Sequence, residues 1–163
     1  VPRHPQRFDE VAQVLHEQGI QTIRRSAWTG NPSEWSLPPD HEVILGDSLG
    51  EMALYYGMSD VALLGGSFEP LGGQNLIEPL AYGSPVVVGP HTFNFEQATM
   101  EALRAGVAVR VNQMDEGVQA ALAWTRQQPQ DAKGSQACVQ FVQQHAGAVA
   151  RSLERLRRWL PET

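Results

Sequence analysis

Short apolar segments rich in β-branched residues recur along this chain, and each is followed by residues with helical spacing. The clearest examples are EVILG at 42–46, DVALL at 60–64, PVVV at 85–88 and VAVRV at 107–111. Strands that are apolar on both faces are typical of a parallel sheet that helices cover on both sides. The repeated alternation therefore predicts an α/β fold with a doubly wound parallel sheet.

The spacing of apolar residues also indicates where the helices of this fold lie. We expect helices over residues 8–18, 48–56, 75–82, 93–105 and 115–127, and one more short strand over 20–23. Residues 26–41, rich in Trp, Gly and Pro, predict a loop. Two further helices, over 133–145 and 148–160, follow the last strand. The second is amphipathic, which is typical of a helix packed on a domain or of one that touches an anionic membrane.

Composition narrows the class of protein. A chain of 163 residues is long enough for a single domain with its own core, and we expect one domain over 1–163. The net charge of -6 gives no electrostatic footprint for nucleic acid, so we expect no nucleic-acid partner. Cys138, the single cysteine, excludes an internal disulfide and a cysteine-based metal site. The five histidines show no metal-ligand spacing, and a G-x-G-x-x-G fingerprint is absent, which argues against a dinucleotide cofactor.

The chain opens with Val-Pro-Arg-His-Pro and no initiator Met. We interpret this start as a boundary inside a longer protein, with Pro2 and Arg3 at the end of a strand that precedes the chain. The guanidinium of Arg3 is suited to a bidentate contact with phosphate. No apolar run approaches the roughly 20 residues that a membrane-spanning helix needs.

Ligands of parallel α/β sheets bind at the carboxyl ends of the strands, so the loops that leave the strands are the candidate sites. The first such loop, at 46–51, turns directly into a predicted helix. It leaves the backbone N–H groups of Leu49, Gly50 and Glu51 available to an anion or a base edge. Ordinary helix capping by Ser48 and Glu51 is the alternative.

The second exit loop, at 65–79, carries the strongest signal. Gly72 and Gly73 allow a close approach of the backbone to a phosphate or sugar, and a helix is predicted to begin at Asn75. One turn later, the carboxylate of Glu78 is suited to accept two hydrogen bonds from the vicinal hydroxyls of a ribose. Asn75 and Glu78 also have the spacing of a capping box, and that alternative stays open.

The third exit loop, at 89–95, contains His91, Phe93 and Phe95. His91 is a candidate general acid or anion contact, or simply a surface residue of the loop. We interpret the two phenylalanines as packing residues.

These segments, taken together and in order, resemble one family. Pro-Arg-His-Pro at the start, LGDSLGEM, DVALLGGSF and GGQNLIEPLAYGSPVVVGPHTFNF are similar to 3-deoxy-D-manno-octulosonic acid (Kdo) transferases, which are glycosyltransferases of the GT-B fold. The similarity runs from about residue 1 to residue 111. Ser48 stands where the family pattern has Thr, and Glu69 stands where an apolar residue is common.

The resemblance implies a Rossmann-like C-terminal GT-B domain with extra C-terminal helices, which binds the donor CMP-Kdo. The parent enzyme would transfer Kdo to a lipid A precursor, with inversion and without a metal or cofactor, at the cytoplasmic face of the bacterial inner membrane. Its N-terminal domain would hold the acceptor and the catalytic base, so we expect no catalytic residue in this chain and no activity from it alone. The implied substrate-binding residues are Pro2, Arg3, Leu49, Gly50, Glu51, Gly73, Asn75, Leu76, Ile77 and Glu78.

Two other classes of protein remain as alternatives. One is the C-terminal domain of another GT-B enzyme, such as a UDP-sugar transferase or epimerase. The other is a non-catalytic flavodoxin-like binding module, which would carry acidic residues after its first strand where this chain carries glycines.

Overall fold

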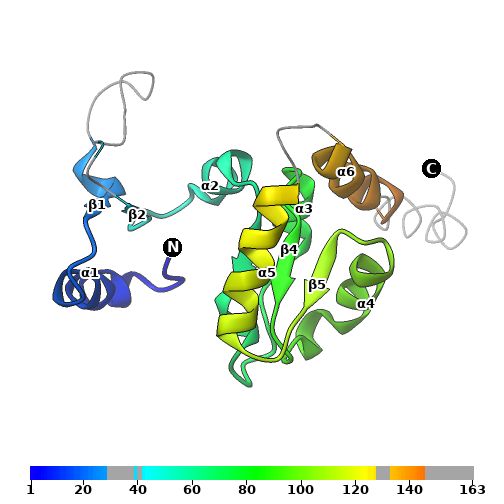
Figure 1. Cartoon of the computed structure of the whole chain (residues 1–163), viewed down its shortest axis with the longest axis horizontal. Helices are drawn as coiled ribbons and strands as arrows, with labels where there is room; N and C mark the ends of the chain where they lie inside the picture. The colour runs from blue at the N-terminus through cyan, green and yellow to red at the C-terminus, as the bar shows by residue number, and fades with distance from the viewer. Residues whose placement is uncertain (29–38, 40–41, 128–132, 146–163) are drawn as a thin grey trace, which may run out of the picture. The chain divides into compact units, whose positions relative to one another are not determined.

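A computed structural model describes residues 1–28, 39, 42–127 and 133–145 of the chain. The chain divides into two compact units, Val1–Met52 and Ala53–Thr163 (Figure 1). Most of the predicted loop at 26–41 and all of the predicted helix at 148–160 lie outside the described residues.

Unit 1 is a helix on a two-stranded parallel sheet. Its elements are η1 (Pro5–Arg7), α1 (Phe8–Glu17), β1 (Thr22–Arg24), η2 (Arg25–Ala27) and β2 (Val43–Leu45). The strands pair with Ile23 opposite Ile44, and α1 packs against β1. The acidic residues in the first turn of α1 stabilise the helix, because their negative charges lie at the positive end of its dipole. The helix and both strands predicted for this part of the sequence are confirmed, each within about two residues of its expected bounds.

Unit 2 contains a three-stranded parallel sheet in the order β3-β4-β5, with Leu63, Val87 and Val109 in register. Its strands are β3 (Ala62–Leu64), β4 (Val86–Val88) and β5 (Ala108–Arg110). Its helices are η4 (Gly65–Ser67), α3 (Ile77–Ala81), η5 (Phe93–Phe95), α4 (Glu96–Arg104), α5 (Met114–Gln127) and α6 (Lys133–His145), while α2 (Met52–Met58) begins at the boundary between the units.

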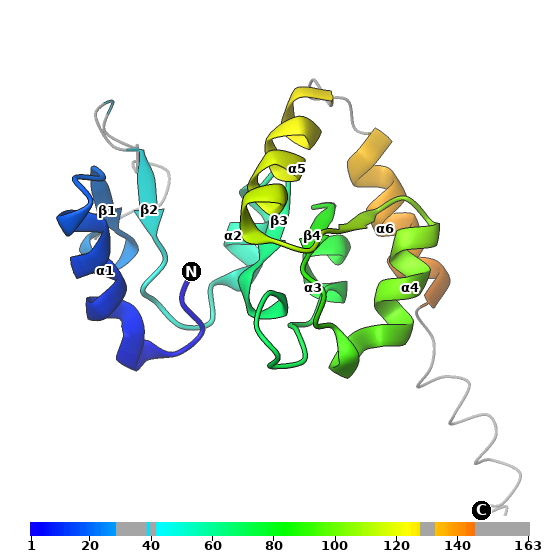
Figure 2. The same cartoon turned by 60° about the horizontal axis from the view of Figure 1, so that its bottom comes forward.

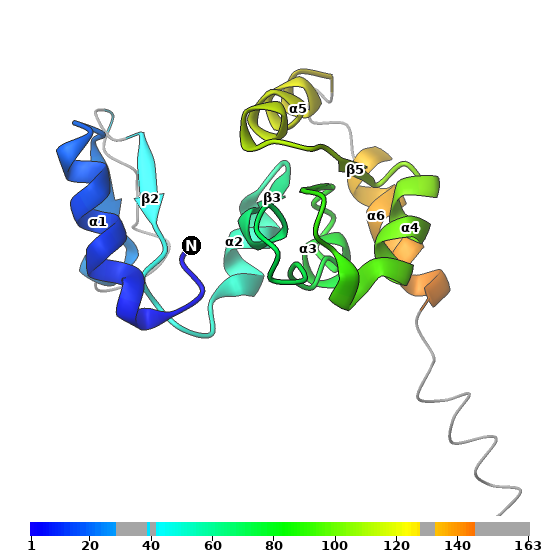
Figure 3. The ribbon, with the colours of Figure 1, turned by 90° about the horizontal axis from the view of Figure 1, so that it is seen from below.

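Helices lie on both faces of this sheet, as the predicted doubly wound fold requires (Figure 3). On one face, Val86 and Val88 pack into a core with Leu80 of α3, Ala102 of α4 and Phe141 of α6. The other face is covered by α5, which packs on β3 and β4. All three residues of β4 are buried because the strand has helices on both sides.

Three predicted helix starts are wrong, each by two to four residues. Gly50 has a φ of +79°, which an α-helix does not accommodate, so α2 begins at Met52 rather than at residue 48. The side chain of Asn75 binds the N–H of Ile77, a local turn that competes with helical pairing and moves the start of α3 to Ile77. The segment predicted as one helix over 93–105 is divided into η5 and α4, because Phe95 has non-helical backbone angles.

Leu80 offers a direct test of where the core of unit 2 lies, since its side chain is 0% exposed. Leu80→Ala removes methyl groups from a packed interior, and we expect a loss of about 2–5 kcal/mol in the free energy of unfolding. Leu122→Ala on α5 is the matched control, since Leu122 is 43% exposed and its truncation should cost far less. Urea denaturation followed by circular dichroism measures both, and equal losses would contradict this assignment of the core.

Candidate functional site

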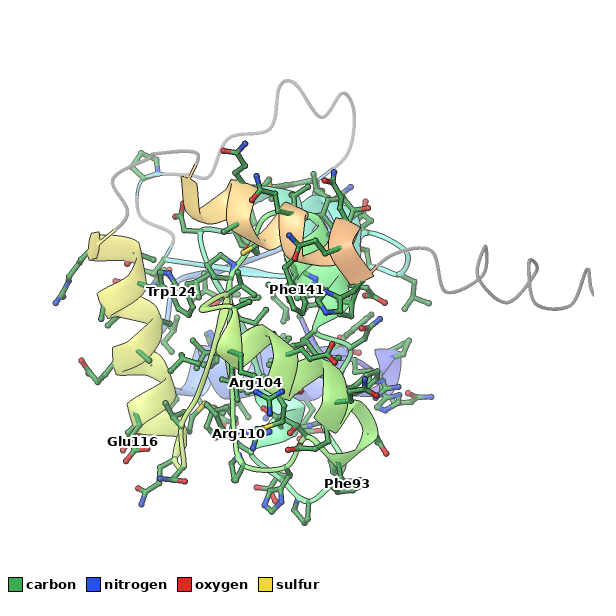
Figure 4. The ribbon with its side chains drawn as sticks, turned by 90° about the vertical axis from the view of Figure 1, so that its right-hand side faces the viewer. Phe93, Arg104, Arg110, Glu116, Trp124 and Phe141 are labelled. Carbon is green, nitrogen blue, oxygen red and sulfur yellow. The ribbon has the colours of Figure 1, made fainter. Side chains whose placement is uncertain are left out.

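The carboxyl ends of the unit 2 strands meet at one edge of the sheet. Phe93, Arg110 and Glu116 lie along this edge (Figure 4). The loop from β3 to α3 and the loop from β4 to α4 run side by side there (Figure 2). A backbone hydrogen bond of 3.1 Å from the Asn94 N–H to the Gly72 carbonyl joins them. The second and third exit loops predicted from the sequence therefore form one continuous surface.

The glycine pair of the second exit loop has left-handed backbone angles, with φ of +90° at Gly72 and +81° at Gly73. A Cβ atom added at Gly72 would lie 2.1 Å from the Asn94 side-chain nitrogen, and one at Gly73 would lie 3.0 Å from the His91 carbonyl oxygen. Both positions therefore require glycine for the turn and for the approach of the neighbouring loop. The sequence predicted close approach to a ligand, and the structure shows a close approach within the protein itself.

The Asn75 side chain bonds both the backbone and Glu78, in an arrangement that differs from a capping box. The Asn75 side-chain oxygen accepts the Ile77 N–H at 3.0 Å, and its amide nitrogen donates to one carboxylate oxygen of Glu78 at 3.2 Å. In a capping box the carboxylate would instead accept a backbone N–H. Glu78 is exposed, and its second carboxylate oxygen accepts no hydrogen bond from the described residues. That oxygen is available to a hydroxyl of a ligand.

The remaining predicted residues of this loop face inward. Leu76 is fully buried in the core, and Ile77 packs against the same core while half-buried. Gly73 is buried as well. Of the residues predicted here, Asn75 and Glu78 alone present polar side chains at the surface, and the others could serve a ligand only through their backbones.

In unit 1 the first exit loop is held by a buried carboxylate. The Asp47 side chain is 1% exposed and accepts hydrogen bonds from the Arg24 Nε at 2.5 Å and from the N–H and hydroxyl of Ser26 at 2.7 and 2.6 Å. Burial raises the pKa of Asp47, but the bonds from Ser26 and Arg24 outweigh it, so the pKa lies below its usual value. Sequence reasoning did not identify this buried carboxylate as a support of the loop.

Three residues around position 50 were predicted to contact a ligand, and the carboxylate of one of them, Glu51, is already bonded within the protein. Glu51 accepts hydrogen bonds from the hydroxyl of Ser48 and, at 2.6 Å, from the Arg25 guanidinium. These two partners lower the pKa of the Glu51 carboxyl. Leu49 and Gly50 are exposed and precede α2 instead of forming its first turn.

At the start of unit 1, Pro2 is half-buried and Arg3 is exposed. Arg3 makes no hydrogen bond or ion pair with other residues that the structure describes. Its guanidinium is therefore available to an anion.

A charged cluster that the sequence did not indicate supports the third exit loop. Arg110, the last residue of β5, donates to the Thr92 hydroxyl at 2.6 Å and to Glu96 at 3.0 Å. The Thr92 hydroxyl also donates to Glu96 at 2.5 Å, and the pKa of Glu96 is lowered by Thr92 first and by Arg110 second. The one available signal was a charged residue at the end of an otherwise apolar strand.

Over the described ranges, no three His, Cys, Asp or Glu side chains gather closely enough to hold a metal ion. In the same part of the chain, no helix combines the length and apolarity needed to cross a membrane.

Parallel strands with helices on both faces and exit loops that meet at one edge define a Rossmann-like α/β domain. No protein-family profile matches the chain. The chain is 47% identical over 160 residues to the 3-deoxy-D-manno-octulosonic acid transferase of Bordetella pertussis and 37% identical over 162 residues to that of Haemophilus influenzae. Each alignment covers 98% of this chain and 36% of the relative, so the chain spans little more than a third of their length.

A solved structure is also similar to this chain in its fold. The chain superposes on the C-terminal CMP-Kdo binding domain of WaaA from Acinetobacter baumannii with a TM-score of 0.76 and 33% identity, covering 88% of this chain and 72% of that domain. The chain therefore belongs to the family of C-terminal domains of Kdo transferases. The Rossmann-like GT-B fold and the resemblance found in the sequence are confirmed.

The buried carboxylate of unit 1 predicts an acid-dependent loss of stability. A lowered pKa means that Asp47 stabilises the fold above the unfolded-state value of about 3.9 and loses that contribution as pH falls through the folded-state value. Asp47→Asn should cost about 1.5–3 kcal/mol at pH 7, as expected for hydrogen bonds to a charged group. The difference in the free energy of unfolding between Asp47→Asn and wild type should decrease below about pH 4.

Urea denaturation between pH 7 and pH 3 measures this difference. Asp9→Asn is the matched control, because Asp9 binds the same arginine at 2.7 Å but its side chain is 89% exposed. An exposed pair contributes little, so this variant should remain close to wild type. A difference for Asp47→Asn that stays constant with pH would show that its carboxylate is not the titrating group.

Proposed function

We propose that this chain binds CMP-Kdo and forms the donor-binding half of a glycosyltransferase that transfers Kdo to a lipid A precursor. The observation that carries the proposal is the similarity to a solved CMP-Kdo binding domain over most of both chains. The two curated relatives, both Kdo transferases, support it.

Within unit 2, we assign the nucleoside contact to Gly73, Asn75, Leu76, Ile77 and Glu78. The free carboxylate oxygen of Glu78 would accept a hydrogen bond from a ribose hydroxyl, and the exposed edge of Asn75 lies next to it. The side chains of Leu76 and Ile77 pack into the core, so both residues would contribute backbone groups alone. The Ile77 N–H would exchange its bond to the Asn75 side chain for one to the donor. Because α3 is short and its Ile77 N–H is already bonded, a helix dipole would add little here.

Within unit 1, we assign donor contacts to Pro2, Arg3, Leu49, Gly50 and Glu51. Arg3 is the residue suited to phosphate, because it is exposed and has no partner among the described residues. Glu51 would contribute its backbone N–H, because its carboxylate is engaged by Arg25 and Ser48.

The proposed chemistry is a direct displacement at the Kdo anomeric carbon with inversion, without a metal ion or cofactor. A carboxylate base would deprotonate the acceptor hydroxyl, and the donor site would hold the CMP leaving group. We assign that base to the acceptor-binding N-terminal domain, in the part of the relatives that this chain does not match. The full-length enzyme would work at the cytoplasmic face of the inner membrane, and we expect no transfer by this chain alone.

A nucleotide titration tests the proposed donor. We expect CMP to shift the backbone amide resonances of residues 72–78 in two-dimensional NMR spectra, and UMP to shift them far less at equal concentration. Shifts with UMP alone would favour a UDP-sugar enzyme. No shift with either nucleotide would favour a non-catalytic binding module and contradict the proposal.

Glu78→Gln tests the ribose contact. Replacing a charged acceptor by a neutral amide should weaken CMP binding about tenfold or more, because hydrogen bonds to charged groups contribute about 1.5–3 kcal/mol. Glu69→Gln is the matched control: Glu69 is also an exposed carboxylate of the same exit loop, and no contact is assigned to it. Isothermal titration calorimetry measures both affinities, and equal losses would show a general charge effect instead of a specific contact.

A further inference from the structure

We propose that Asn94 is a positioning residue for the donor loop, here defined as residues 71–78, and that its side-chain amide sets the affinity for the nucleotide. This inference rests on the proposed function and adds a residue to which that function assigned no role. It gives a role to part of the GPHTFNF segment at 89–95, which belongs to the family resemblance but carries none of the predicted ligand contacts.

Asn94 binds the donor loop at two consecutive carbonyl groups. Its backbone N–H donates to the Gly72 carbonyl at 3.1 Å, and its side-chain amide donates to the Leu71 carbonyl at 3.3 Å. The ring of Phe93 lies against the same glycine, since a Cβ at Gly72 would be 2.7 Å from a ring carbon. The start of the donor loop is therefore held against η5, the turn that carries the labelled Phe93 in Figure 4.

The residues that hold the donor loop are themselves fixed. The fully buried Ser67 accepts the Gly89 N–H with its hydroxyl at 2.7 Å, and its carbonyl accepts the His91 N–H at 2.9 Å. The Thr92 side chain is held by Arg110 and Glu96. Asn94 therefore attaches the donor loop to a neighbouring loop that is itself held in place.

The donor loop needs such a support because its first half contains neither helix nor strand. From Leu71 to Asn75 the described backbone has no regular secondary structure, and two residues in it have positive φ. Asn75 and Glu78, the polar residues of the proposed site, follow directly. A loop that is ordered before the ligand arrives loses less conformational entropy on binding, which raises affinity.

Two variants separate hydrogen bonding by the amide from simple packing. Asn94→Ala removes the side chain, whereas Asn94→Asp keeps its size and the backbone N–H but replaces the donor facing the Leu71 carbonyl with an acceptor. Asn112→Ala is the control, because Asn112 is exposed and its side chain makes no hydrogen bond to the described residues.

The first measurement needs no ligand. Hydrogen exchange by NMR should be faster at the amides of residues 73–77 in both Asn94 variants, with the amides of β3, β4 and β5 unchanged. The control variant should match wild type throughout. Unchanged exchange in the donor loop would overturn the proposal, as would uniformly faster exchange across unit 2, which would indicate a general loss of stability.

The second measurement is CMP affinity by calorimetry. Loss of one hydrogen bond that orders the loop should weaken binding about threefold to tenfold in both Asn94 variants and leave the control unchanged. Faster loop exchange with unchanged affinity would overturn the positioning role while the proposed function stands. No CMP binding by the wild-type chain would contradict the proposed function, and the positioning role would fall with it.

Discussion

The two hydrogen bonds of the buried Ser67 hydroxyl determine how the carboxyl ends of the unit 2 strands are arranged. The hydroxyl donates to the Leu64 carbonyl at the end of β3 and accepts the Gly89 N–H just beyond β4. Two neighbouring strands therefore end at a fixed distance from each other, and their exit loops leave side by side. The contacts between Asn94 and Gly72 follow from that geometry. A buried polar group with both of its bonds satisfied orders the edge without the cost of an unpaired group.

The fold was predictable from the sequence to the extent that local patterns determine it. The Val-Val-Val run of β4 and the helical spacing after it identified the parallel sheet, because strands buried on both faces leave few polar positions. The helix starts were not predictable to the residue. The local sequence permits a positive φ at Gly50 and a bond from the Ile77 N–H to the Asn75 side chain, but it requires neither of them.

In the candidate site, too, residues in local sequence patterns could be predicted, and residues that act on distant partners could not. Gly73, Asn75 and Glu78 could be proposed from the sequence, because a glycine pair before a helix and a carboxylate one turn later form a local pattern. Ser67 and Asn94 could not be, since each acts on a partner more than 20 residues away. Asp47, which binds Arg24 across a similar separation, was missed for the same reason. Residues that support a site escape sequence reasoning because their contacts arise only when distant segments meet.

The distribution of charge indicates how such a domain could hold an anionic donor. The chain carries a net charge of -6, and Arg24, Arg25 and Arg110 are each bonded to a carboxylate. Their charges are largely neutralised within the protein, so long-range attraction for an anion is weak. Under the proposed function, affinity would then depend on short-range contacts: the Arg3 guanidinium with the phosphate, and directional hydrogen bonds at Glu78 and the backbone. Such contacts need groups held in place, so the order of the loop around Gly72 would contribute to affinity alongside the charge of Arg3.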